Sequence, residues 1–106
     1  MPTPSSVRTT INGPRSVLDL KRPPTSPGEM LLEEFLRPGG LTQVEAARRM
    51  KIPLNRLNEI IRGRRGITAD TALRLARLFK MSPEFWMGLQ TDWDLWHAAH
   101  ALRHAG

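Results

Sequence analysis

The residues with the clearest chemical potential lie between positions 42 and 65, where basic and amide side chains alternate with apolar ones. Asparagine can form paired hydrogen bonds with adenine, and arginine can do the same with guanine. A helix over 54–62 with its apolar side turned inward would expose five such polar side chains: Asn55, Arg56, Asn58, Glu59 and Arg62. This stretch therefore has the chemistry of a surface that binds phosphates and reads bases.

The charge around that stretch is one-sided. Between positions 48 and 65 the only acid is Glu59, against seven basic residues: Arg48, Arg49, Lys51, Arg56, Arg62, Arg64 and Arg65. The whole chain has 16 Lys and Arg against 10 Asp and Glu, a formal net charge of +6. Such a surplus favours a polyanionic partner, because each neutralised phosphate releases counterions.

Capping signals and apolar spacing predict the elements that must position these side chains. Serine followed by proline and an acid opens a helix at Ser26 and again at Ser82. Thr42 with Glu45 forms a capping box, and Thr68 starts another helix. We expect five helices, at about 26–36, 42–50, 54–62, 68–79 and 82–102. Nothing alternates with period two, so the chain is predicted to be all-α.

The second and third helices are predicted to form a helix-turn-helix over residues 42–63. A short turn forces the two helices to cross steeply, and the small Ala47 lets their backbones approach. The inward face of this pair is predicted to be apolar: Leu41, Ala46, Ala47, Met50, Ile52, Leu57, Ile60 and Ile61. The third helix would then place its basic face in the major groove of DNA.

Several function classes find no support in the sequence. There is no cysteine, which excludes disulfides and thiolate metal sites. No apolar run approaches the roughly 20 residues of a membrane helix, and the start has no secretory signal, so we expect a cytoplasmic protein. No glycine-rich phosphate loop or nucleophile–base pair is present. We expect neither an enzyme nor a cofactor.

The first 25 residues are rich in Pro, Ser and Thr and carry four basic residues against one acid. They offer little apolar surface to offset the entropy of ordering, which predicts a disordered basic extension over 1–25. A second interpretation is a segment that folds on a partner, anchored by Val17, Leu18 and Leu20. Residues 26–106 are predicted to form the DNA-binding and dimerisation domain.

The last predicted helix carries an aromatic stripe. Four side chains spaced at three and four are predicted to form a homodimer interface: Trp86, Leu89, Trp93 and Trp96. Packing into the domain's own core is the alternative. A two-fold dimer would present two recognition helices about 34 to 36 Å apart, which requires an inverted-repeat operator. His97, His100 and His104 share one face, but we expect solvated histidines and no metal.

Five stretches carry a resemblance to a known family. Leu41–Ala47 together with Leu57–Gly63 resembles the Cro/C1-type (XRE, lambda-repressor-like) helix-turn-helix domain. Pro27–Leu36, Gly66–Ala76 and Ser82–Trp86 resemble, more narrowly, the HigA antitoxin family, also called plasmid-maintenance antidotes. The resemblance covers about residues 26–97. It implies a five-helix domain of this type with an extended C-terminal helix.

The resemblance also implies roles for individual residues. Gln43 would touch a phosphate, Leu54, Asn55 and Glu59 would face the bases, and Arg56 with the turn at 62–66 would clamp the DNA backbone. With the exposed polar side chains above, the predicted DNA-binding set is Thr42, Gln43, Leu54, Asn55, Arg56, Asn58, Glu59, Arg62, Arg64 and Arg65.

Three positions depart from the family pattern: Ser26 replaces a histidine, Lys51 replaces the turn glycine, and Pro53 replaces a serine or threonine cap. If the turn keeps φ above zero, lysine costs about 1 kcal/mol. The missing cap hydroxyl also costs about 1 kcal/mol. The fold should tolerate both changes, but the operator preference of relatives does not transfer.

The resemblance implies the antitoxin of a type II toxin–antitoxin pair. It would bind a HigB-like mRNA-cleaving toxin and repress its own operon by binding double-stranded DNA as a dimer. Two other interpretations stay open: a stand-alone repressor with no toxin, and a sensor that binds a small molecule or metal through the aromatic or histidine residues of the last helix.

Overall fold

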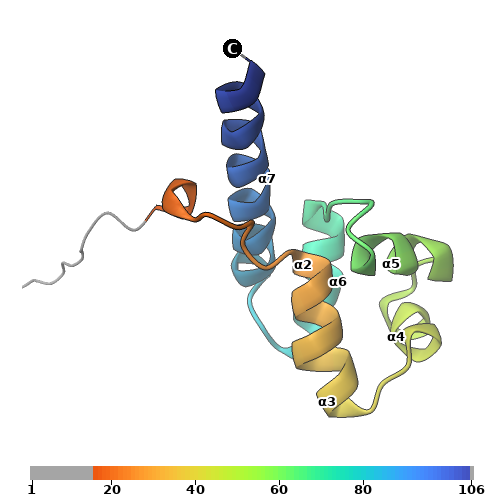
Figure 1. Ribbon diagram of the computed structural model, residues 1–106. Coiled ribbons are helices and arrows are strands. Elements are labelled where there is room, and N and C mark those ends of the chain that lie inside the picture. Colours follow the sequence, from red (N-terminus) through yellow and green to blue (C-terminus); the bar gives the residue numbers. More distant parts are fainter. Residues whose placement is uncertain (1–15, 106) are drawn as a thin grey trace, which may run out of the picture. The chain divides into compact units, whose positions relative to one another are not determined.

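The computed structural model describes residues 16–105, and within that range every regular element is helical. The first helix runs without a break through three labelled segments, α2 (Pro27–Met30), the π-helical η3 (Leu31–Leu36) and α3 (Arg37–Gly39) (Figure 1). It is followed by α4 (Gln43–Met50), α5 (Leu54–Ile61), α6 (Ala69–Phe79) and α7 (Pro83–Ala105). Counted this way there are five helices, which confirms the predicted Cro/C1-type fold with an extended C-terminal helix.

Hydroxyl caps begin four of these helices, as predicted. Ser26, Thr42, Thr68 and Ser82 each accept a hydrogen bond at 3.1 to 3.4 Å from the backbone N–H three residues later. Such a cap stabilises a helix by about 1 kcal/mol because it satisfies an N–H without an intrahelical acceptor. Only α5 begins without one, since Pro53 has no hydroxyl. Its start must be fixed by tertiary contacts.

Left-handed backbone ends three of the helices, at Gly40, Lys51 and Lys80. The first helix continues past its predicted end near Leu36, through Pro38, and stops at Gly40, where φ is 64°. Proline removes only its own N–H donor, whereas the left-handed conformation turns the chain out of the helix. Lys51 ends α4 with φ of 59°. The sequence alone left open whether this turn keeps φ above zero. Here it does, at a cost of about 1 kcal/mol for a residue other than glycine.

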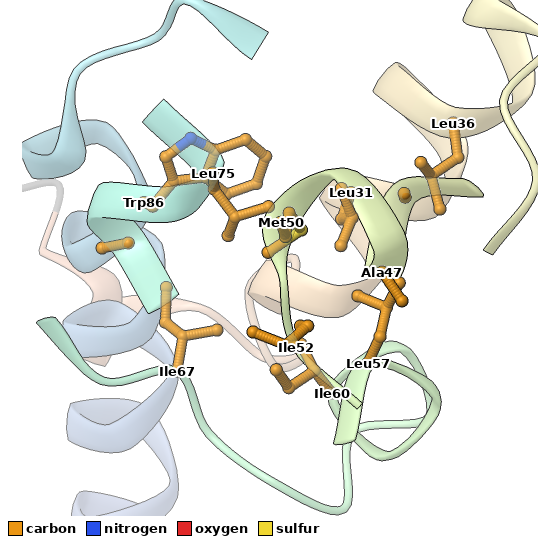
Figure 2. Packing of buried hydrophobic residues seen from close by; sticks show 12 residues of the cluster. Leu31, Leu36, Ala47, Met50, Ile52, Leu57, Ile60, Ile67, Leu75 and Trp86 are labelled. Carbon is orange, nitrogen blue, oxygen red and sulfur yellow. The ribbon is translucent and has the colours of Figure 1, made fainter. Parts of the chain in front are cut away.

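The described residues divide into two units, one of residues 25–91 and one of residues 16–24 with 92–105. The core of the first unit draws on every helix in it, and Figure 2 shows Leu31, Met50 and Ala47 gathered near Leu57. The predicted inward residues of α4 and α5 are all buried here or partly buried, which confirms the helix-turn-helix core. None of the helices in residues 16–105 has the length and apolarity to cross a membrane.

Gly28 sets the distance between α2 and the end of α5. A Cβ atom built on Gly28 would lie 2.0 Å from the carbonyl oxygen of Ile60 and 2.8 Å from the Cα of Ile61. These are backbone atoms that cannot rotate away, so only glycine allows the two helices to approach this closely. The contact fixes the last turn of α5 against the first helix.

Gln90 supplies a polar anchor from α7. Its Oε1 accepts a hydrogen bond of 2.9 Å from the backbone N–H of Ile67, and both residues are buried. Gly66 makes room for this side chain, since a Cβ there would lie 3.0 Å from the Gln90 amide. This side chain thus anchors the end of the loop between α5 and α6.

Trp86 belongs to the core of the first unit. Its side chain has no exposed surface, and its ring lies 5.0 Å from that of Phe35 and 5.1 Å from that of Phe85. The prediction that Trp86 lies in a dimer interface is wrong, because a side chain without exposed surface cannot contact a second copy. The spacing of the aromatic stripe is the same whether the side chains are buried in the domain's own core or in a dimer interface.

The second unit contains a short 3-10 turn, η2 (Val17–Asp19), capped by Ser16. The indole Nε1 of Trp96 donates a hydrogen bond of 2.8 Å to the carbonyl oxygen of Leu20. Residues 16–20 therefore have a defined conformation that the sequence did not predict. Of the predicted disordered extension over 1–25, residues 1–15 lie outside the described residues.

We predict that Gly28→Ala lowers the free energy of unfolding by about 1 to 3 kcal/mol, the usual cost of overpacking. The added methyl group meets backbone, so α2 and α5 must separate. Gly39→Ala is the matched control, since nothing lies within 4 Å of a Cβ at that helical position. Urea unfolding of both variants checks the prediction, and equal midpoints would contradict it.

Candidate nucleic-acid interface

A side-chain hydrogen bond joins the start of α4 to the middle of α5. Asn58 Nδ2 donates to Gln43 Oε1 across 3.3 Å, and both side chains are partly buried. Both residues were predicted to contact DNA. The structure brings them together, so that each orients the other. A phosphate contact from Gln43 would use its amide N–H₂, which this bond leaves available.

Arg56 is held by α6. Its Nη2 atom donates to the Thr71 hydroxyl at 2.7 Å and lies 3.2 Å from Asp70 Oδ2. The Arg56 side chain is only 28% exposed. The prediction placed this arginine on the DNA backbone, whereas here its guanidinium bridges the first turn of α5 to the start of α6. It replaces the missing hydroxyl cap as the anchor of this helix end.

Asp70 accepts from a second arginine as well. Arg74 Nε lies 2.9 Å from Asp70 Oδ2, and Arg74 Nη1 donates to the carbonyl oxygen of Met50 at 2.8 Å. The hydrogen bond from Arg74 is the largest cause that lowers the pKa of Asp70 below its usual 3.8. Desolvation opposes it, and the hydrogen bond from Arg56 and the charges of both arginines add to the lowering. One carboxylate therefore connects α5 and α6, and through Arg74 the end of α4.

Glu59 is paired rather than free. Arg65 Nε lies 2.9 Å from its Oε1, and the backbone N–H of Arg64 donates to its carbonyl oxygen at 2.9 Å. The pair holds the turn after α5 against that helix. It also neutralises the one acid on a surface otherwise suited to phosphates.

The remaining predicted residues form the exposed part of the candidate interface. Leu54 is 45% exposed, and Asn55, Arg62 and Arg64 are exposed without a side-chain partner in the described part of the chain. Thr42 is also exposed, but its hydroxyl caps α4. An exposed leucine can contact a thymine methyl, an asparagine can pair with adenine, and arginines at the turn can bind phosphates.

No pattern in the sequence indicated that Asp70, Thr71 and Arg74 are partners of this interface. They lie 14 or more positions from Arg56 or Met50, and no local spacing rule connects positions so far apart. The only available signal was the acid in the first turn of α6, which the helix dipole explains equally well.

The predicted dimer residues of α7 differ in exposure. Leu89 and Trp93 are partly buried, whereas Trp96 is only 9% exposed. Within the second unit, the Trp96 ring stacks on His100 at 4.9 Å, and His100 lies 4.4 Å from His104. Trp93 and Leu89 are thus the members of the stripe that keep surface for a partner.

Comparison with known proteins gives the interface its context. The helix-turn-helix family model matches residues 32–86, which span η3 to the start of α7. The virulence-associated protein I of Dichelobacter nodosus is 48% identical over 73 residues, covering 69% of this chain and 68% of that protein. Antitoxin HigA-1 of Vibrio cholerae is 43% identical over 77 residues, covering 72% and 71%.

A solved structure agrees with these relatives. The Pseudomonas aeruginosa antitoxin HigA with the higBA promoter is 42% identical and superposes with a TM-score of 0.72. The match covers 76% of this chain and 86% of that one. The likeness to this solved antitoxin therefore covers about three quarters of the chain in both sequence and fold.

We predict that Asp70→Asn destabilises the protein at neutral pH and that this difference disappears in acid. Because the folded pKa of Asp70 is lowered, its contribution is complete above the usual value of 3.8 and is lost as pH falls through the lowered value. Urea unfolding from pH 7 to pH 2 checks this, with the exposed Asp92→Asn as control. A difference that does not change with pH would contradict the prediction.

Proposed function

The chain belongs to the HigA family of helix-turn-helix proteins, and we propose that it is the antitoxin of a type II toxin–antitoxin pair. It binds a HigB-like mRNA-cleaving toxin and represses its own operon. The observation that carries the DNA-binding part is the exposed edge of a firmly held α5, with Leu54 and Asn55 at its start and Arg62 and Arg64 at its end. The related HigA of Pseudomonas aeruginosa was solved with its promoter, which supports the same role here.

Base reading and phosphate binding divide between the two ends of this edge. Leu54 and Asn55 lie at the N-terminal end of α5, the end that enters the major groove in helix-turn-helix proteins. Arg62 and Arg64 lie in the turn that follows, where phosphate contacts fix the register. The intramolecular contacts of Arg56, Asn58 and Glu59 make them positioning residues in this scheme.

Repression of the operon through an inverted-repeat operator requires two copies of the chain. We infer a homodimer through α7, in which Trp93 supplies a partly exposed aromatic side chain for the interface. Two-fold symmetry would then place two α5 helices about 34 to 36 Å apart, one turn of DNA. Each inverted repeat would bind two chains.

We predict that Asn55→Ala and Arg62→Ala weaken operator binding in different ways. Loss of the asparagine should cost about 1 to 3 kcal/mol and relax specificity at one base pair. Loss of the arginine should weaken binding to operator and scrambled duplex alike, and reduce the salt slope by about 1. Fluorescence anisotropy at several salt concentrations, with the inverted repeat upstream of the gene, measures both.

Two results would contradict this assignment. One is equal affinity of wild type for the operator and for a scrambled duplex. The other is an Asn55→Ala protein whose affinity and base preference match those of wild type. Titration to saturation also tests the dimer, since the proposal requires two chains for each inverted repeat.

We expect a basic toxin, which would bind an acidic surface of this chain. A groove of about 470 Å³ lies along the first helix, with Met30, Phe35 and Phe85 among its lining residues. Three carboxylates also line it: Glu29, Glu33 and Glu34. An apolar floor beside carboxylates suits lysine or arginine side chains, whose stems are apolar and whose heads are charged. A basic toxin fits this groove better than it fits the basic surface of α5.

We predict that Glu34→Lys abolishes toxin neutralisation but keeps operator binding. The variant reverses the charge of an exposed residue in the groove, so a basic toxin would be repelled. The readout is growth of cells that co-express the adjacent reading frame. Glu84→Lys, an exposed residue outside the groove with the same charge change, should still relieve growth arrest.

Wild type that fails to relieve the arrest would contradict the antitoxin proposal. If the adjacent frame is not toxic and wild type still binds the operator, the chain is instead a stand-alone repressor. A Glu34→Lys protein that neutralises as well as wild type would contradict the placement of the toxin on this groove.

A further inference from the structure

A second groove carries the opposite charge. It encloses about 340 Å³ between the end of α4 and α6. Among the described residues, its lining contains the apolar Met50 and Leu78 and no carboxylate. The other four lining side chains are cationic: Arg49, Lys51, Arg74 and Arg77. Only Arg49 and Lys51 of these belong to the basic stretch predicted to face DNA. The groove thus extends the positive surface from the helix-turn-helix onto α6.

Lys51 occupies a conformation that favours glycine. Its φ is 59° and its ψ is 45°, the left-handed region that β-carbon-bearing residues enter at a cost. Here the side chain adds a charge to the groove that glycine would not supply.

Arg74 is fixed before any ligand arrives. Its Nε lies 2.9 Å from Asp70, and its Nη1 donates to the Met50 carbonyl at 2.8 Å. Arg49, Lys51 and Arg77 surround it, all exposed and without an ion pair in the described residues. The groove therefore combines one oriented guanidinium with three cations that are free to bind oxyanions.

We propose that this basic groove binds phosphates of the DNA backbone outside the segment that α5 reads. The inference rests on the proposed function, and it names a further part of the DNA-binding surface. Lys51 lies in the turn that leads directly to Leu54, so the same duplex is within reach. An alternative role for the cations at the end of α4 is to stabilise that helix through its dipole. This alternative involves no contact with DNA.

The test compares Lys51→Gly and Arg77→Ala with wild type on two operator duplexes. The long duplex extends the inverted repeat by several base pairs of arbitrary sequence at each end, and the short one stops at its ends. On the long duplex, the slope of log K against log salt concentration should be smaller in magnitude by about 0.9 for each lost phosphate contact. Each lost contact should also weaken binding about eightfold at 0.1 M salt. On the short duplex wild type and variants should bind alike.

Lys51→Gly also separates binding from folding. Glycine adopts the left-handed conformation freely, so the thermal unfolding midpoint should stay at or above that of wild type while affinity falls. Lys80→Gly is the matched control. Lys80 ends α6 with φ of 58°, is exposed, and does not line the groove. It should gain the same stability and keep full affinity for the long duplex.

Several results would overturn the proposal. One is equal affinity of Lys51→Gly, Arg77→Ala and Lys80→Gly on the long duplex. Another is an equal loss on both duplexes, which would place these contacts inside the half-sites. A free anion is the ligand instead if two results occur together. Inorganic pyrophosphate would raise the unfolding midpoint of wild type but not of Lys51→Gly or Arg77→Ala, and these two variants would bind DNA as tightly as wild type. Wild type that binds neither duplex would remove the proposed function itself.

Discussion

The close contact between Gly28 and the carbonyl of Ile60 determines where the recognition helix lies. It fixes the last turn of α5 against the first helix, at a distance that only glycine allows. The other contacts act on the rest of the helix: Asn58 bonds to Gln43 of α4, and Arg56 bonds to Asp70 and Thr71 of α6. Because α5 is held along its length, DNA binding does not have to include the free-energy cost of orienting this helix.

This arrangement divides the arginines of the domain into two groups. Arg56, Arg65 and Arg74 hold helices and turns together through Asp70 and Glu59, whereas Arg62 and Arg64 have no such partner in the described residues. Net charge cannot distinguish these groups, since every arginine contributes equally to it. The paired acids matter as much, because an unpaired carboxylate beside α5 would repel phosphates. Structural ion pairs therefore also improve the surface offered to DNA.

Local features were predictable from the sequence, and long-range partners were not. The four hydroxyl caps and the inward faces of α4 and α5 depend on neighbouring residues, and they were predicted. The left-handed turn at Lys51 was only a condition suggested by the family pattern, which the structure meets. The Arg56–Asp70 pair and the Gln90–Ile67 bond join residues 14 and 23 positions apart, which no helical period relates. Trp86 was misplaced because one amphipathic spacing serves a core face and a dimer face equally.

If the two grooves of the first unit bind the partners proposed for them, a small basic domain can serve two partners. Carboxylates line the groove along the first helix, and cations line the groove at the end of α4 and on α6. Salt screens exposed charges over about 8 to 10 Å, so a partner in contact with one groove responds chiefly to the charge nearby rather than to the net charge. A basic protein and a polyanion then use different side chains. On the proposed placement, the two partners would therefore not compete directly for one surface.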